Sequence, residues 1–122
     1  MTLFLRSGTI KNDDRKILVA WAAGFFEGEG HVNVQLRQSK SFFSLTVAQV
    51  YRSPLDKLCE IFGGKVYGPY GPYSSNKQPY YQWQVYNEKA FNALDEMFPH
   101  LLRKGEQALE KLQLWKEHCE QR

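Results

Sequence analysis

The stretch Ala22-Ala-Gly-Phe-Phe-Glu-Gly-Glu-Gly30 marks the point where the hydrophobic period of the chain changes. Before it, Asp13 and Asp14 precede an apolar run that predicts a helix, capped by one of these aspartates and ending near Gly28 or Gly30. After it, residues 31–37 alternate strictly, which predicts a strand with one wet face and with Val32, Val34 and Leu36 inward. A helix that passes directly into a strand is therefore the first feature of the fold.

Small residues recur at every fourth position of the predicted helix, at Ala20, Gly24 and Gly28. Residues four apart lie on one face of a helix, and Gly inside a helix costs about 1 kcal/mol relative to Ala. This stripe of small residues predicts that another backbone approaches the helix closely, because such an approach compensates for the cost.

The rest of the chain predicts two hairpins separated by a helix. Residues 42–51 form the partner of the first strand, with Phe43, Leu45 and Val47 inward. Ser53 is predicted to cap a helix that begins with Pro54 and ends at Gly63-Gly64, with an apolar stripe of Leu55, Leu58 and Ile61 or Phe62. Residues 65–70 and 80–87 are predicted to form a second pair of strands around a long polar loop.

Two helices are predicted to follow the second hairpin. Asn87 caps the first, which runs to about Met97, and Pro99 separates it from the second. The last helix extends from Leu101 to about Cys119 and has Gly105 as a weak point near its start; its predicted inward residues are Leu109, Leu112 and Trp115.

The composition indicates one globular domain over residues 1–122, with a net charge of only +3. Two cysteines sixty residues apart predict free thiols and no zinc site. The longest apolar run, residues 17–26, is too short to span a bilayer, and the first residues do not resemble a signal peptide. We expect a soluble intracellular protein of the cytoplasm, nucleoid or an organelle, not a secreted or membrane protein.

The positions of the charged side chains along the sequence indicate the binding partner better than the net charge does. Residues 31–52 and 65–87 contain no carboxylate among their side chains, but they carry five basic residues: Arg37, Lys40, Arg52, Lys65 and Lys77. Glutamines also recur along the predicted strands. A solvated sheet surface has a similar composition, but the lack of acids favours double-stranded DNA, whose phosphates bind Lys and Arg and whose base edges bind Gln, Asn and Arg.

The nine-residue stretch resembles the motif of the LAGLIDADG homing endonucleases, with Ala23, Gly24 and Gly30 matching and Glu27 and Glu29 in place of the two aspartates. The predicted order of elements resembles the αββαββα core of that family. The resemblance implies an α+β fold with an antiparallel DNA-binding sheet, followed by a C-terminal helix. Because the chain has one motif, it also implies a homodimer whose interface contains Ala20, Gly24 and Gly28.

The motif also predicts a metal site. A carboxylate at the C-terminal end of a helix meets the negative end of the helix dipole, and a dimer axis would bring a second copy close to it, so the pair favours a cation. Phosphodiester hydrolysis by paired Mg²⁺ ions suits such carboxylates. We therefore assign Glu29 as catalytic residue and metal ligand; Mn²⁺ or Ca²⁺ can substitute for binding. The resemblance adds the Gly28 carbonyl as a ligand and gives Glu27 a structural role.

Two more positions match the active site of the family. Gln49 falls where members commonly carry a glutamine that orders water near the metals. Lys104, five residues after Pro99, falls where a lysine often supports the scissile phosphate, and Arg103 is the alternative if the register differs by one residue. A lone basic residue on a helix is also commonly a solvated surface residue.

Residue-wise matching to the family gives the DNA-binding candidates. Those on the first hairpin and just after it are His31, Asn33, Gln35, Arg37, Lys40, Ser44, Thr46 and Arg52. Those on the second hairpin are Tyr67, Lys77, Gln82 and Gln84.

The resulting hypothesis is a homodimeric, Mg²⁺-dependent, site-specific DNA endonuclease that cuts both strands of a long pseudo-palindromic site and leaves short 3′ overhangs. The alternative is a member that binds without cleaving, such as an intron maturase with an RNA partner or a DNA-binding regulator. A generic α+β interaction domain is a third class, and it would show no salt-dependent binding of nucleic acid.

Overall fold

The computed structural model describes residues 12–36, 41–72 and 77–120. Its elements are α1 (Asn12–Glu29), β1 (Gly30–Gln35), β2 (Phe42–Gln49), α2 (Ser53–Phe62), β3 (Lys65–Tyr70), β4 (Tyr80–Tyr86), α3 (Asn87–Met97), the short 3₁₀ helix η2 (Phe98–His100) and α4 (Arg103–Glu120). This α+β order confirms the predicted succession of helices and hairpins. None of the helices in these ranges has the length and hydropathy that a membrane span requires.

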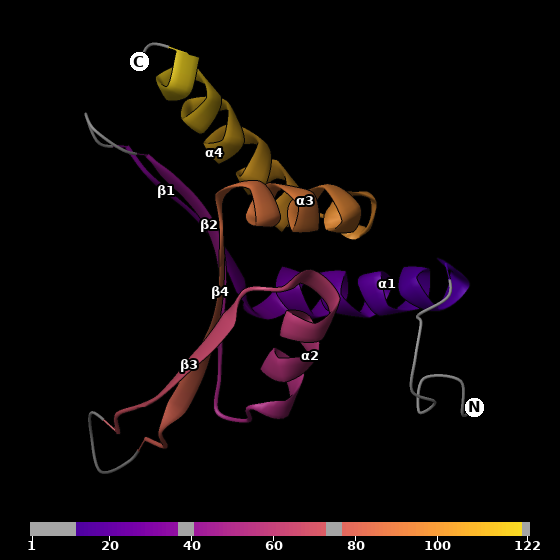
Figure 1. Cartoon of the computed structure of the whole chain (residues 1–122), viewed down its shortest axis with the longest axis vertical. Helices are drawn as coiled ribbons and strands as arrows, with labels where there is room; N and C mark the ends of the chain where they lie inside the picture. Colours follow the sequence, from indigo (N-terminus) through magenta and orange to yellow (C-terminus); the bar gives the residue numbers. More distant parts are fainter. Residues whose placement is uncertain (1–11, 37–40, 73–76, 121–122) are drawn as a thin grey trace.

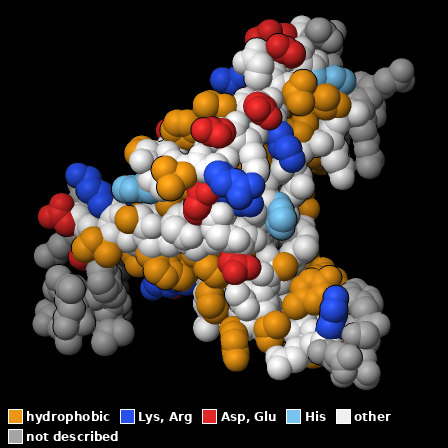
Figure 2. Space-filling view, turned by 180° about the vertical axis from the view of Figure 1, so that it is seen from behind, with side chains coloured by type: hydrophobic (Ala, Val, Ile, Leu, Met, Phe, Trp, Pro, Cys, Tyr) orange, Lys and Arg blue, Asp and Glu red, His pale blue; other side chains and the backbone are white. Residues whose placement is uncertain are grey.

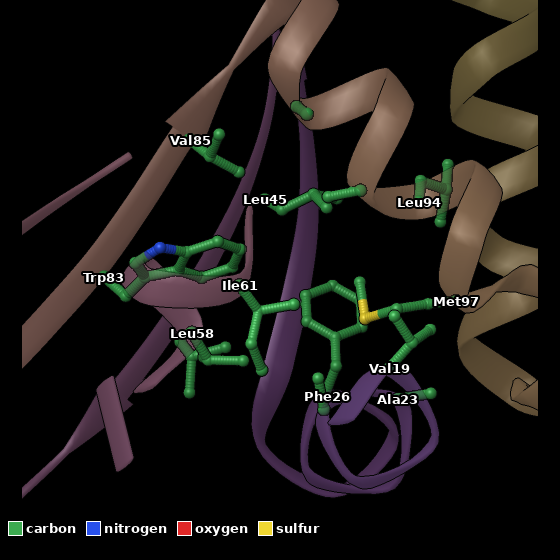
Figure 3. Packing of buried hydrophobic residues seen from close by; sticks show 14 of the residues in the cluster. Val19, Ala23, Phe26, Leu45, Leu58, Ile61, Trp83, Val85, Leu94 and Met97 are labelled. Carbon is green, nitrogen blue, oxygen red and sulfur yellow. The ribbon is translucent and has the colours of Figure 1, made fainter. Parts of the chain in front are cut away.

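The four strands form one antiparallel sheet in the order β1-β2-β4-β3. Figure 1 shows the sheet nearly edge-on, with α1, α2 and α3 against one of its faces and α4 near β1. The core lies between the sheet and these helices, and Figure 3 shows Phe26, Leu45 and Met97 converging there from α1, β2 and α3. No helix among the described residues covers the opposite face of the sheet (Figure 1).

The entry into the sheet depends on a glycine. A Cβ at Gly30 would lie 2.2–2.6 Å from the ring atoms of Phe26, a side chain that is fully buried in the core. Only glycine therefore allows α1 to turn into β1 while this ring fills the space beneath it. Gly64 plays a comparable role after α2, because its φ is +88° and a Cβ there would lie 2.5 Å from the Gln84 carbonyl oxygen.

Arg15 of α1 connects this helix to α2 and α3. The Nε and Nη2 atoms of Arg15 donate to the Glu96 carboxylate at 2.9 and 2.6 Å, and Nη2 also donates to the Ile61 carbonyl at 3.2 Å. The hydrogen bonds that Arg15 donates to the Glu96 carboxylate raise the pKa of the Arg15 guanidinium. This bidentate pair holds α1 against the ends of α2 and α3.

Three predicted helix caps are wrong. The first helix begins at Asn12, so Asp13 and Asp14 lie within its first turn, where they still complement the helix dipole. Ser53 is itself helical, and no side chain caps α2; the Arg52 carbonyl accepts the N–H groups of the first turn. Asn87 turns its side chain away from α3, and its Oδ1 accepts the Phe43 N–H of β2 at 3.1 Å.

The strand and core predictions need three corrections. The first strand ends at Gln35, and Leu36 is 44% exposed because it lies beyond the last residue paired with β2. The second strand ends at Gln49, two residues earlier than predicted. Leu109 is 54% exposed, because α4 presents its small residues Gly105 and Ala108 to the core.

Other predictions are confirmed. Leu55, Leu58 and Ile61 are the buried residues of α2, and both cysteines are free. In α4, the side chains of Leu112 and Trp115 are half-buried, as predicted, and the centroids of the Trp115 and Phe43 rings are 5.8 Å apart.

The helix α4 also covers the edge strand β1. Its Lys111 Nζ donates to the Val32 carbonyl of β1 at 2.7 Å.

Candidate active site and nucleic-acid interface

The last turn of α1 carries the acidic residues of the motif, and their environments differ. Glu29 ends the helix and is exposed, and its carboxylate has no hydrogen bond or ion pair within the residues that the structure describes. The last carbonyls of a helix also lack partners within the helix, and Gly28 lies in that turn. An uncompensated carboxylate therefore stands beside carbonyl oxygens that have no partner within the helix, at the negative end of the helix dipole.

Glu27 has a different role, because its carboxylate caps the N-terminus of α4. Its oxygens accept the backbone N–H groups of Leu102 at 2.8 Å and Arg103 at 3.0 Å, and they lie 3.3 and 3.4 Å from the N–H nitrogen of Lys104. These are among the N–H groups that a helix leaves unsatisfied at its start. The structure thus gives Glu27 a structural function, and no local sequence pattern predicts its partner.

Gln49 and Lys104 lie at the same end of the sheet as Glu29. The register pairs Gly30 with Val47, so the end of β2 lies beside the end of α1, and Gln49 is the last residue of β2. Lys104 is half-buried in the first turn of α4, and Glu27 holds its backbone. Arg103, its alternative in the other register, is exposed in the same turn. Three elements therefore converge here, although no hydrogen bond joins these three side chains in the described ranges.

The stripe of small residues on α1 is exposed. Ala20, Gly24 and Gly28 face solvent, and a Cβ built at either glycine would meet no atom within 4 Å. Beside the stripe, Trp21 is 42% exposed and stacks on Phe25 with ring centroids 5.6 Å apart. The close approach that the glycines predict is therefore not made by any described part of this chain.

The uncovered face of the sheet forms a groove of about 590 Å³. Its lining side chains are mainly polar and come from three strands: Asn33, Val34, Gln35, Phe42, Ser44, Thr46, Gln84 and Tyr86. Cross-strand neighbours form rows over this face, one of which runs His31, Thr46, Gln84, Lys65. The Nδ2 of Asn33 donates to the Thr46 hydroxyl at 3.3 Å. An ordered polar surface of this kind can offer hydrogen bonds to base edges.

The placements of the DNA-binding candidates are mixed. His31, Asn33 and Gln35 are exposed on the groove face, Thr46, Gln82 and Gln84 are half-buried there, and Tyr67 is 37% exposed on β3. Ser44 is only 8% exposed. Its neighbours surround it, so it lies at the floor of the groove and can contact a base only there. Arg37 and Lys40 lie outside the described residues.

Two basic candidates lie off the strands of this face. Arg52 precedes α2, where its Nε is 3.1 Å from an Asp56 oxygen and its guanidinium carbon is 5.6 Å from the centre of the Tyr81 ring. Lys77 is exposed in the connection between β3 and β4. Figure 2 shows acidic side chains over the helices, whereas the hairpin of β3 and β4 at the lower right shows basic and hydrophobic side chains and none that are acidic.

Three residues that line the groove, Val34, Phe42 and Tyr86, were not among the predicted DNA-binding residues, and Tyr86 is the one of them with a polar group on its side chain. Tyr86 is 45% exposed on the same face as Gln82 and Gln84, and its hydroxyl donates to Gln84 Oε1. The period of two along β4 would have identified it, because residues 82, 84 and 86 share one face of a strand.

No group of three or more His, Cys, Asp or Glu side chains that could hold a metal ion occurs in residues 12–36, 41–72 and 77–120. A metal at the end of α1 would therefore take the Glu29 carboxylate and backbone carbonyls as its ligands from one copy of the chain. These are hard oxygen donors, which fit Mg²⁺ or Ca²⁺, and their small number leaves coordination positions for water, phosphate and a second copy.

Comparisons with known proteins agree with this fold. Residues 22–119 match the family model described as LAGLIDADG endonuclease. The chain resembles the homing endonuclease I-CvuI, crystallised with the I-CreI target and Mg with the DNA not cleaved, at a TM-score of 0.68 and 26% identity, over 86% of this chain and 69% of that one. A second I-CvuI structure, with its own target and Ca, gives a TM-score of 0.67 at 26% identity over the same shares.

The homing endonuclease I-TnaI shares the fold at a TM-score of 0.57 and 20% identity, over 80% of this chain and 70% of that one. No curated protein matches the sequence.

Proposed function

The chain belongs to the LAGLIDADG endonuclease family, and on this premise we propose that it is a homing endonuclease that hydrolyses both strands of a specific DNA site. It acts as a homodimer and uses Mg²⁺. Because each copy carries one motif, the two copies read the two halves of a long, pseudo-palindromic site.

One observation supports this proposal above the others: the exposed stripe of small residues ends beside an exposed, uncompensated carboxylate. Gly24 and Gly28 leave open space above the helix, which a second α1 fills when the two helices cross. Because Glu29 directly follows Gly28, this crossing brings the Glu29 carboxylates of both copies to the same place. Two adjacent carboxylates repel each other unless a cation lies between them.

The residues at the end of α1 fit the metal. Glu29 would hold it through its carboxylate, and Gly28 through its carbonyl. When bound, Mg²⁺ neutralises charge on the scissile phosphate and activates a water molecule. The other coordination positions would be open to water and to DNA phosphates, so a complete site would require the substrate and the partner copy.

The other side chains at this end position the substrate. Gln49 Oε1 accepts the Val50 N–H at 2.9 Å, which fixes the amide and leaves its Nε2 group as a donor for a water or a phosphate oxygen. Lys104 supplies a positive charge to the phosphate from the first turn of α4, which Glu27 holds in place. Neither residue needs to change its protonation state for these roles.

The groove face of the sheet supplies the sequence specificity. A twisted antiparallel ribbon fits the major groove, where amide and hydroxyl groups can distinguish base pairs. The absence of carboxylates from residues 31–52 and 65–87 keeps this face free of repulsion with phosphates. I-CvuI, which shares the fold, was crystallised with its DNA target.

The test is a cleavage assay in Mg²⁺ on the DNA that flanks the gene, joined as if the gene were absent. We expect the wild type to make one double-strand break, and Glu29→Gln to bind this DNA without cutting it. Binding without cleavage by both proteins, or binding of the transcript instead, would replace the nuclease by a binding protein or a maturase. Equal cleavage by the variant would remove Glu29 from the active site.

A further inference from the structure

Three side chains of the central strand β4 form a hydrogen-bonded relay on the groove face. The Tyr86 hydroxyl donates to Gln84 Oε1, and Gln84 Nε2 donates to Gln82 Oε1 at 2.6 Å. The residues are two apart along the strand, so all three point to the same side of the sheet. The relay has a direction, because each amide donates through nitrogen and accepts through oxygen.

The start of the relay is held in place. The Tyr86 ring contacts the Phe42 ring edge to face, with centroids 6.4 Å apart, and the backbone of Tyr86 pairs with Ser44 of β2. Gln84 lies between Thr46 on β2 and Lys65 on β3. The phenol is therefore anchored to the neighbouring strand, and its hydroxyl is within reach of Gln84 without a change of backbone.

Counting donors and acceptors shows what the relay leaves for a ligand. A glutamine amide has two N–H donors and two oxygen lone pairs. Among the described residues, Gln84 uses one N–H toward Gln82 and one lone pair toward Tyr86, so one donor and one acceptor remain. Adenine presents the complementary pair in the major groove, the N7 acceptor and the N6 amino donor, whereas guanine presents two acceptors. Gln82 retains both of its N–H donors.

We propose that Tyr86 is a specificity-determining positioning residue, which orients the Gln84 amide through its hydroxyl so that Gln84 selects adenine in each half of the DNA site. This inference rests on the proposed function, since it requires that the groove face binds DNA. Without the hydroxyl, the terminal torsion of Gln84 has two roughly equivalent orientations, and the relay can reverse. The variant then accepts other bases at this position.

The experiment selects bound sequences from a library of double-stranded DNA with randomised base pairs, using the full chain in Ca²⁺. Each base pair of the selected site is then changed singly, and binding is measured for the wild type and for Tyr86→Phe. The variant Gln84→Ala identifies the base pair that Gln84 contacts. Tyr70→Phe is the matched control, because no hydrogen bond of the Tyr70 hydroxyl occurs among the described residues and its ring pairs with Tyr80.

We expect the wild type to prefer adenine at that base pair. Tyr86→Phe should reduce this preference at least about fivefold, the lower end of the discrimination that a bidentate contact provides. Preferences at the other positions, and all those of Tyr70→Phe, should not change. The proposal is overturned if Tyr86→Phe keeps the preference, if it weakens binding equally at every position, or if the wild type prefers guanine there.

A second measurement does not depend on DNA. In the free protein, the side-chain amide resonances of Gln82 and Gln84 should shift in Tyr86→Phe and remain in place in Tyr70→Phe. Unchanged resonances would overturn the relay even if DNA binding is strong. If the wild type selects no DNA while the resonances do shift, the relay exists but the proposed function fails and the assignment to adenine fails with it.

Discussion

The carboxylate of Glu27 lies 3.3 and 3.4 Å from the backbone nitrogen of Lys104, and it accepts that N–H together with those of Leu102 and Arg103. A motif residue of α1 is therefore the cap of a helix, α4, whose first residue lies 76 residues later in the chain. The contact joins the acidic end of α1 to the basic first turn of α4, and both contribute to the candidate active site.

Glu27→Ala should lower the free energy of unfolding by about 1–2 kcal/mol, because it leaves helix N–H groups without their charge-assisted acceptor. Glu27→Gln retains one oxygen acceptor and should lose less. Urea unfolding followed by circular dichroism measures both values. The matched control is Glu106→Ala, which alters an exposed acid in the first turn of the same helix. Equal losses for Glu27→Ala and Glu106→Ala would mean that the cap contributes nothing of its own.

Gly24→Leu should convert the proposed dimer into a folded monomer. The side chain enters open space on the isolated chain, so the fold is retained, but it blocks the approach of a second α1. Sedimentation analysis would give the mass, and the circular dichroism spectrum would verify the fold. An unchanged mass for the variant would show that this stripe is not the interface.

Gly28, in the last turn of α1, and Gly30, the first residue of β1, should respond in opposite ways to the same substitution. Gly30→Ala places a Cβ against the Phe26 ring and should cost roughly 1–3 kcal/mol of stability, as overpacking does in well-packed cores. Gly28→Ala meets nothing in the isolated chain, and the higher helix propensity of Ala should stabilise it by up to about 1 kcal/mol.

Thermal unfolding of the two variants at a concentration where the chain is monomeric is the appropriate measurement. If Gly30→Ala proved as stable as the wild type, the close contact between α1 and β1 described above would be wrong.

DNA affinity should fall steeply with salt, because binding to phosphates releases counterions. Lys65→Gln, on the groove face, should reduce the slope of log K against log salt by about one for each copy of the chain. Lys116→Gln is the control, because its ammonium lies 5.7 Å from the centre of the Phe91 ring on the side of the helices. Identical slopes for all three proteins would remove Lys65 from the interface.

Sequence patterns were enough to predict the helices and strands and to select the candidate catalytic residues. They were not enough to predict how some side chains pack. Alternation in residues 31–37 is enough to identify β1, because inward and outward side chains differ in polarity. Leu109 shows where the helical pattern of apolar residues gave a wrong prediction of burial. It continues an apolar stripe, but Gly105 and Ala108 form the buried side of α4, since small residues allow the helix to approach the core more closely.

The sequence by itself determined the order of the elements, the helix-to-strand turn and the separation of acids from the groove face, because these depend on residues that are neighbours along the chain. Only the tertiary structure decided that Glu27 caps α4, that Asn87 Oδ1 binds Phe43 and that the stripe on α1 remains uncovered. A hydrogen bond depends on distance in space and not on distance along the chain. Folding places Glu27 and Asn87 beside partners that are far from them in the sequence.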